Sequence, residues 1–310
     1  GGTSPYTYLW SNNATTEDIS GIGPNTYTVT STDANGCTFS DFAVVNEPQI
    51  LSASISGTNV SCYGGNNGAA DLTVAGGNGG YTYLWSTFAT TEDLSGLIAG
   101  NYVVIVSDSK NCQTITSVTI TQPAQLTITA TVTNILCNSG GTGAIDVTVT
   151  GGAGSYIYGW SNSATTEDLT GLSAGTYTIT VTDGNGCVAT ATYTITEPAA
   201  LTLSGIVTDV TCSGYSNGGV NITVVGGNGP YTYLWTNNAT TEDLSGLSGG
   251  TYDVTITDAN GCTIGGSYTI GEPTAITSSI VGTNVTCYGA SNGAATLTVG
   301  GGTPPYTFLW

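Results

Sequence analysis

The tryptophans of this chain recur at a fixed step of 75 residues, at positions 10, 85, 160, 235 and 310. Two columns of cysteines keep the same step, namely Cys37, Cys112, Cys187 and Cys262, and Cys62, Cys137, Cys212 and Cys287. No insertion interrupts the register anywhere in the 310 residues. A constant period of this length is typical of a protein in which one structural unit is repeated along the chain.

Glu-Pro or Gln-Pro pairs mark the expected boundaries between repeats, with the prolines at positions 48, 123, 198 and 273. We expect a partial repeat at residues 1–47, complete repeats at 48–122, 123–197 and 198–272, and a partial repeat at 273–310. The sequence opens and stops inside a unit, as a segment of a longer array would. A unit of this size is near the lower limit for an independent core, so neighbouring repeats or disulfides are expected to support it. A short linker that contains proline favours a stiff array.

Alternation of apolar and small polar residues predicts β-strands within each repeat. In the repeat 48–122 the expected strands cover residues 50–55, 70–74, 81–85, 92–97, 101–107 and 114–121. Glycine-rich segments such as 76–77 separate them, because glycine ends strands and begins turns. No segment has a helical period. The unit is therefore predicted to be all-β.

Residues 97–102 have the L-x-x-G-x-Y form of a tyrosine corner, which begins a strand of an immunoglobulin-like sandwich. The expected corner tyrosines are Tyr27, Tyr102, Tyr177 and Tyr252. The tryptophans of the third strand are expected in the core, although an aromatic column could instead form a face that stacks on sugars: Trp85, Trp160 and Trp235. The predicted fold is a tandem array of seven-strand immunoglobulin-like β-sandwiches.

Charged residues make up only 7% of the chain, and Lys110 is the one base against 20 acids, giving a formal charge of −19. Nucleic acid is excluded as a partner because phosphate neutralisation needs lysine and arginine. An anionic membrane surface is disfavoured for the same reason. No apolar stretch is long enough to span a bilayer, so we expect no membrane insertion in this segment.

The residue types that most enzymes need are missing, since the chain has no histidine and no arginine. Acid-base catalysis, catalytic triads and phosphate-binding loops therefore lack their components, and we do not expect an enzyme. Carboxylates remain, chiefly in the recurring A-T-T-E-D segment. We expect them to cap a turn. Calcium is the one cofactor considered, with weak candidate ligands at Glu92, Asp93, Asp108, Glu167, Asp168 and Asp183, but the dense D-x-D-x-D pattern of calcium loops is absent.

Eight cysteines without a CxxC pair fit disulfides better than zinc or buried thiols, which indicates an oxidising, extracellular setting. Cys62 and Cys112 are expected at opposite ends of one sandwich, about 20 Å apart, whereas a disulfide tolerates a Cα separation of ~4.4–6.8 Å. We therefore favour pairing across the boundary, Cys62 with Cys187 and Cys137 with Cys262. Pairing within one repeat, Cys62 with Cys112, and pairing of the neighbours Cys37 and Cys62 remain open.

The motifs T-C-x-G-x-x-x-G, G-G-x-x-x-Y-x-Y-x-W, L-x-x-G-x-Y and D-x-N-G-C recur in this order, and the chain resembles the SprB-repeat family over its whole length. The resemblance implies a very large surface adhesin of gliding Bacteroidota, exported by type IX secretion and used in attachment and gliding.

The leading hypothesis is an extracellular stalk on the cell surface that holds a distal adhesive tip and bears tension, with neighbouring repeats as its partners. The alternative is a multivalent array of weak glycan- or surface-binding sites, with surface polysaccharide as the partner and avidity from repetition.

Overall fold

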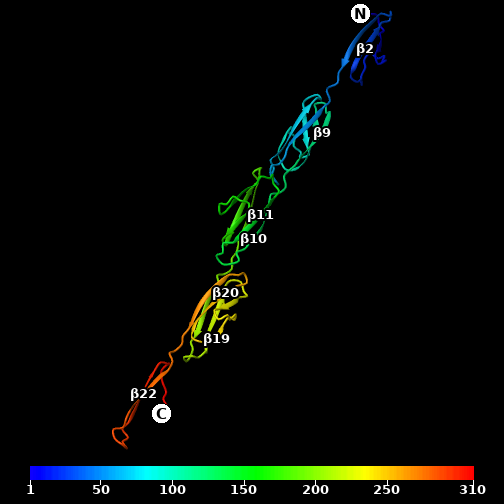
Figure 1. Ribbon diagram of the computed structural model, residues 1–310. Coiled ribbons are helices and arrows are strands. Elements are labelled where there is room, and N and C mark those ends of the chain that lie inside the picture. Colours follow the sequence, from blue (N-terminus) through cyan, green and yellow to red (C-terminus); the bar gives the residue numbers. More distant parts are fainter. The chain divides into compact units, whose positions relative to one another are not determined.

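The computed structural model describes residues 1–310 and consists of strands β1 to β23 (Figure 1). It contains no α-helix, so the all-β prediction is confirmed. Accordingly, no helix is present that could cross a membrane.

The complete strand set of residues 48–122 shows the fold of one repeat. Its strands are β4 (Ser52–Thr58), β5 (Gly68–Ala75), β6 (Thr82–Trp85), β7 (Leu94–Leu97), β8 (Gly100–Ser107) and β9 (Gln113–Ile120). They form two antiparallel sheets, in the orders β4-β5-β7 and β6-β8-β9. In an immunoglobulin-like sandwich, strands A, B and E share one sheet and strands C, F and G share the other. The strand order here is the same, so the immunoglobulin-like fold class is confirmed.

The prediction of seven strands per repeat is wrong, because the strand usually called D is absent. The A-T-T-E-D segment between β6 and β7 is a turn, as the sequence indicated. The Trp85 amide donates to the Ala89 carbonyl at 3.0 Å, and the Thr91 hydroxyl donates to the Asp93 carbonyl at 2.7 Å. The indole nitrogen of Trp85 donates to the Thr91 carbonyl at 2.9 Å. These local hydrogen bonds use backbone groups that would otherwise pair with a neighbouring strand.

The same strand set recurs in the next two repeats. One consists of β10 (Thr127–Thr133), β11 (Gly143–Thr150), β12 (Ile157–Trp160), β13 (Leu169–Leu172), β14 (Gly175–Thr182) and β15 (Val188–Ile195). The other consists of β16 (Thr202–Thr208), β17 (Gly218–Val225), β18 (Thr232–Trp235), β19 (Leu244–Leu247), β20 (Gly250–Thr257) and β21 (Thr263–Ile270). Their sheet orders repeat the pattern, β10-β11-β13 with β12-β14-β15 and β16-β17-β19 with β18-β20-β21.

The strands outside these sets form single sheets. At one end β1 (Thr7–Trp10), β2 (Asn25–Thr32) and β3 (Thr38–Val45) make one three-stranded sheet. At the other, β22 (Thr277–Thr283) pairs with β23 (Ala294–Gly300). Each of these sheets therefore has one face that no second sheet covers within this chain.

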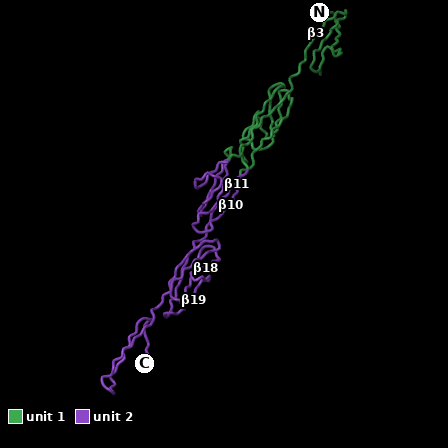
Figure 2. The backbone as a smooth tube through the Cα atoms, in the orientation of Figure 1, with its two compact units in different colours: residues 1–126, 151–155, 183–187 green, residues 127–150, 156–182, 188–310 purple.

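Contacts between residues divide the chain into two compact units (Figure 2). The first comprises residues 1–126, 151–155 and 183–187, and the second comprises residues 127–150, 156–182 and 188–310. The 183–187 hairpin thus clusters with residues far earlier in the sequence.

The core of each complete repeat lies between its two sheets. Trp85, Val104 and Ile120 are at most 1% exposed, and they pack with Leu72 and Leu94. Trp235 belongs to the corresponding cluster of the repeat that contains β16 to β21, and Trp160 is likewise buried. Alternate residues of β8 point inward, as the period of two in the sequence requires. The three tryptophans therefore lie in the core and do not form an exposed aromatic face.

Candidate functional site

Disulfides and hydrogen bonds connect successive repeats at their boundaries. One disulfide crosses each of two boundaries: Cys62 to Cys187, with an S–S distance of 2.00 Å, and Cys137 to Cys262, with one of 2.02 Å. The Cα separations are 5.7 Å and 5.6 Å, and each bond spans 125 residues of sequence. These are the two pairs favoured from the sequence, and neither alternative pairing is present. Each bond links the loop after the first strand of one repeat to the hairpin before the last strand of the following repeat.

The remaining four cysteines are free and exposed: Cys37, Cys112, Cys212 and Cys287. Cys37 and Cys112 lie in the hairpins before the last strand of their repeats, and Cys212 and Cys287 lie in the loops after the first strand. Both kinds of cysteine are therefore also present without a disulfide partner in the chain.

An aspartate shapes each hairpin, and it is buried in three of them, as Asp108, Asp183 and Asp258. One carboxylate oxygen of Asp183 accepts from the amides of Asn185 and Cys187 at 2.9 Å and 2.8 Å, and the other accepts from the Ala153 amide at 2.9 Å. Burial alone would raise the pKa of Asp183, but these backbone hydrogen bonds outweigh it and lower the pKa below its usual value. The Asp183 carboxylate therefore holds the turn that contains Cys187 in one conformation.

A second contact across the boundary comes from the asparagine of the D-x-N-G-C motif. The side-chain amide of Asn185 donates to the Ser61 carbonyl at 2.9 Å, and that of Asn260 donates to the Leu136 carbonyl at 3.0 Å. This contact is not among the predictions made from the sequence. The asparagine recurs in three of the four hairpins, as Asn35, Asn185 and Asn260, and Lys110 replaces it in the fourth; this recurrence is the signal that was available.

Hydrogen bonds also fix the residues on either side of the boundary proline. Before Pro123, the Gln122 side chain accepts from the Gly64 amide at 2.8 Å, next to the Cys62 loop. After it, the Ala124 carbonyl accepts from the Gly152 amide at 2.9 Å. The next boundary repeats this pattern, with Glu197 accepting from Ser139 at 2.7 Å and Ala199 accepting from Gly227 at 2.8 Å. The linker is thus bonded on both sides.

The candidate calcium ligands are separated and occupied by hydrogen bonds. Asp93 accepts from the Leu72 amide at 2.9 Å, and Asp168 accepts from the Val147 amide at 2.8 Å. Glu92 and Glu167 hydrogen bond to tyrosines of their own repeats; partial burial and then these carboxylates raise the pKa values of Tyr83 and Tyr158. Asp108 and Asp183 cap hairpins. No three of these acids or any cysteines come together in an arrangement that could hold a metal.

Asp108 makes the hairpin sensitive to acid. Burial would raise its pKa, but hydrogen bonds from Asn78, Cys112 and Lys110 lower it to about 2. A carboxyl whose pKa falls on folding contributes stability above its unfolded value near ~3.9, and this contribution is lost as the pH falls through the folded value. We expect Asp108→Asn to be less stable than the wild type at pH 7, with the difference narrowing between about pH 4 and pH 2. Urea unfolding across this range tests it. The matched control is Asp71→Asn, on an exposed position of β5, and an equal loss of stability in both variants would contradict the role of Asp108.

The four corner tyrosines each donate their hydroxyl to a carbonyl four residues earlier. The distances are 3.0 Å for Tyr27 to Gly23, 2.9 Å for Tyr102 to Ile98, 3.0 Å for Tyr177 to Ser173 and 3.1 Å for Tyr252 to Ser248. This is the local geometry of a tyrosine corner.

Removing one such hydroxyl should have a measurable cost. Tyr102 is 7% exposed, so Tyr102→Phe leaves the Ile98 carbonyl without its partner and should lower the free energy of unfolding by about 1 kcal/mol. Tyr63→Phe in the same repeat is the control, because Tyr63 is exposed. Chemical denaturation of both variants checks the prediction, and equal stabilities would contradict it.

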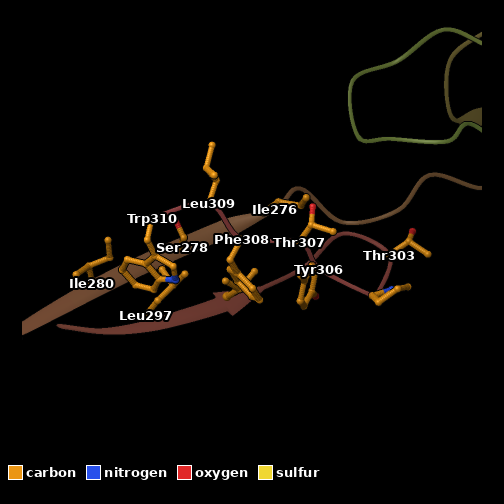
Figure 3. Close-up of a pocket in the computed structure, with 12 residues that line it drawn as sticks. Ile276, Ser278, Ile280, Leu297, Thr303, Tyr306, Thr307, Phe308, Leu309 and Trp310 are labelled. Atoms are coloured by element: carbon orange, nitrogen blue, oxygen red, sulfur yellow. The ribbon is translucent and has the colours of Figure 1, made fainter. Parts of the chain in front are cut away.

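A cavity of about 460 Å³ lies against one face of β22 and β23 (Figure 3). Ile280, Leu297 and Trp310 are among its lining residues, and Trp310 is 80% exposed. The equivalent Trp235, one repeat earlier, is 2% exposed. The cavity thus lies between β22, β23 and residues 305–310, which line it together.

Comparison with known proteins identifies the repeat. The model of the SprB repeat matches residues 54–90, 129–165, 204–240 and 279–310, and the matches begin one repeat apart. No significant match is found among the curated proteins.

Solved structures with some similarity are tandem immunoglobulin-type and adhesion proteins. The eight N-terminal immunoglobulin domains of Down syndrome cell adhesion molecule show 9% identity over 96% of this chain, with a TM-score of 0.31, and the match spans 60% of that structure. Drosophila OTK extracellular domains 3–5 show 12% identity over 66% of this chain and 91% of that one, with a TM-score of 0.28. A C-terminal intimin fragment shows 18% identity over 50% of this chain and 67% of that one, with a TM-score of 0.31.

The family assignment rests on the repeat model, whose four matches fall at the same position of the motif order in every repeat. The chain belongs to the SprB-repeat family, whose repeats occur in surface adhesins.

Proposed function

We propose that this segment is an extracellular stalk of a repetitive surface adhesin, which carries a distal adhesive tip and bears tension during attachment or gliding. Export by type IX secretion and a location on the cell surface belong to the same proposal. The repeat boundaries at 48, 123, 198 and 273 are part of it too.

The observation that supports it is the double connection at the repeat boundaries. Between the cross-linked repeats, force can pass through the peptide chain at Pro123 and through the disulfide between Cys62 and Cys187. Hydrogen bonds of Gln122 and Ala124 hold the peptide side of this connection. A segment that serves only to display separate binding sites does not need such a connection.

Catalysis finds no support in the residues. The buried carboxylates of the hairpins accept backbone amides, and the carboxylates of the A-T-T-E-D turns accept hydrogen bonds within their own repeats. The pKa of Asp183 is lowered by structural hydrogen bonds from backbone amides. We therefore propose a structural rather than enzymatic role.

The competing function is a multivalent glycan-binding array. The tryptophans, which would be the strongest sugar-stacking residues, are at most 5% exposed in the complete repeats. A stalk should accordingly show no saturable binding to polysaccharides when the 310-residue chain is applied to a glycan array. Saturable binding that increases with the number of repeats would overturn the stalk proposal in favour of the binding array.

A further inference from the structure

We propose that Asn185 and Asn260 are positioning residues for the formation of the two boundary disulfides. Each asparagine docks its hairpin on the loop of the preceding repeat while the cysteines are still thiols, and so brings the two sulfurs together for oxidation. The proposal concerns how the cross-links form, and it does not depend on the stalk function.

One backbone carbonyl contacts both the asparagine and the cysteine of the hairpin. The Ser61 carbonyl oxygen lies 2.9 Å from the side-chain nitrogen of Asn185 and 3.4 Å from the sulfur of Cys187. Ser61 directly precedes Cys62, the disulfide partner of Cys187. A hairpin docked through its asparagine therefore has its cysteine beside the residue that it must join.

The second boundary has the same arrangement. The Leu136 carbonyl oxygen lies 3.0 Å from the side-chain nitrogen of Asn260 and 3.4 Å from the sulfur of Cys262, and Leu136 directly precedes Cys137. A thiol can donate a weak hydrogen bond to such a carbonyl, whereas the sulfur of a disulfide carries no hydrogen. Oxidation thus removes the hydrogen bond of the cysteine and keeps that of the asparagine.

The hairpin fixes the asparagine and the cysteine relative to each other. The amides of Asn185 and Cys187 donate to the same carboxylate oxygen of Asp183, at 2.9 Å and 2.8 Å. Asp258 accepts the same pair of bonds in the other hairpin, both at 2.9 Å. Because one oxygen holds both amides, a contact made by the asparagine also places the cysteine.

The turn itself does not need this asparagine. The hairpin of Cys112 has Lys110 at the equivalent position, and the amides of both residues still donate to the Asp108 carboxylate, at 2.9 Å and 2.8 Å. The hydrogen bonds of the turn come from the backbone, which either residue supplies. The asparagine side chain is therefore available for a role outside its own hairpin.

The core of the receiving repeat holds the accepting carbonyl in place. Val60, directly before Ser61, is buried, and its amide donates to the Thr121 carbonyl at 2.9 Å. Ile135 is buried at the other boundary, and its amide donates to the equivalent carbonyl one repeat along at 3.0 Å. The docking point is thus fixed by contacts that do not involve the disulfide.

A groove beside the second disulfide gives an oxidant access to it. The groove encloses about 440 Å³, and Cys137 and Cys262 are both among its lining residues. A small disulfide such as oxidised glutathione can enter a space of this size, because sites for small molecules measure ~300–1,000 Å³. The thiols can therefore react while the hairpin stays docked.

Oxidation by glutathione takes two exchange steps. A cysteine thiolate attacks oxidised glutathione, which forms a mixed disulfide and releases one glutathione thiolate. The second cysteine thiolate then attacks the protein sulfur of the mixed disulfide and releases the other glutathione. The two cysteines lose two protons and two electrons, and one oxidised glutathione is reduced to two thiols. Docking accelerates the second step, since that step needs the two cysteines side by side.

The test follows both bonds in one molecule, the reduced 310-residue chain during reoxidation with glutathione. Serine replaces the four cysteines outside these bonds: Cys37, Cys112, Cys212 and Cys287. Acid quenching and mapping of peptic peptides give the rate at which each bond closes. In Asn185→Ala we expect the Cys62–Cys187 bond to close about fivefold more slowly relative to the Cys137–Cys262 bond, because one hydrogen bond is lost. Effects of folding on the two bonds cancel in this ratio.

Further substitutions identify the group responsible. Asn260→Ala should slow the other bond instead. Asn185→Asp keeps the shape of the side chain but has no donor, so it should slow closure at least as much as alanine. Asn35→Ala is the matched control, because Asn35 has the same place in its hairpin and donates to the Thr3 hydroxyl at 2.8 Å. Closure of Asn185→Asp at the wild-type rate, or the same slowing in Asn35→Ala, would overturn the proposal.

Reduction of the finished bond separates positioning from simple stabilisation. A contact that is present before closure changes the rate of closure, whereas one that forms only afterwards changes the rate of opening. We therefore expect dithiothreitol to reduce the Cys62–Cys187 bond at nearly the same rate in Asn185→Ala and in the chain that retains Asn185. Faster reduction with unchanged closure would show that the asparagine only stabilises the closed boundary, which contradicts the positioning role.

Discussion

Pulled from its two ends, the oxidised chain is expected to extend to roughly half the contour length of the reduced chain, since each extended residue spans at most ~3.3–3.6 Å. The disulfides create a shorter covalent path. It runs from the first residue to Cys62, across to Cys187, back along the chain to Cys137, across to Cys262 and on to Trp310. Residues outside this path cannot be extended until a disulfide is reduced.

Single-molecule force spectroscopy with and without reductant measures this difference. A variant with Cys62→Ser and Cys137→Ser should reach the full length under both conditions, which shows that the limit comes from these bonds. Full extension of the oxidised wild type would contradict the pairing and would remove the main support for a load-bearing stalk.

Loss of a single disulfide should cost roughly 4 kcal/mol or somewhat more of unfolding free energy in the chain-entropy description, because each bond closes a loop well over 100 residues long. We therefore expect the double variant with Cys62→Ser and Cys187→Ser to unfold at a clearly lower urea concentration than the wild type. Tryptophan fluorescence can follow the transition, since Trp85 and Trp160 are buried in the repeats on either side of the boundary.

The control for this variant is Cys37→Ser, which replaces an exposed thiol that has no disulfide partner. A surface change of this kind should shift the stability by no more than about 0.5 kcal/mol. If the double variant and the control unfold at the same midpoint, the long loops contribute nothing and the repeats are stable without their cross-links.

Much of the fold could be read from the sequence because its period and alternation are local signals. The expected strands of the repeat 48–122 lie within three residues of the observed ends. The turn at the A-T-T-E-D segment was also expected from the sequence, and its bonds to Trp85 and Leu72 are present. The seventh strand was wrong because it came from the usual strand count of an immunoglobulin-like sandwich and not from a local pattern in this sequence.

The candidate site was predictable in part for a similar reason. The length of a strand is enough to separate Cys62 from Cys112, so the sequence favours a bond across the boundary. The asparagine contact was missed because Asn185 reaches a backbone carbonyl at Ser61, and any residue could supply that carbonyl. Because every residue has a backbone carbonyl, the identity of Ser61 does not indicate that it accepts this hydrogen bond.

The span of the disulfides has a consequence for damage by proteases. Each bond covers more residues than one repeat contains, so the two loops overlap between Cys137 and Cys187. A single cut anywhere between Cys62 and Cys262 leaves both fragments joined by at least one disulfide. Even one cut in each of the outer loop segments, before Cys137 and after Cys187, leaves three pieces held in one covalent molecule. An array built this way can lose peptide bonds to extracellular proteases and still keep what lies beyond the cut attached.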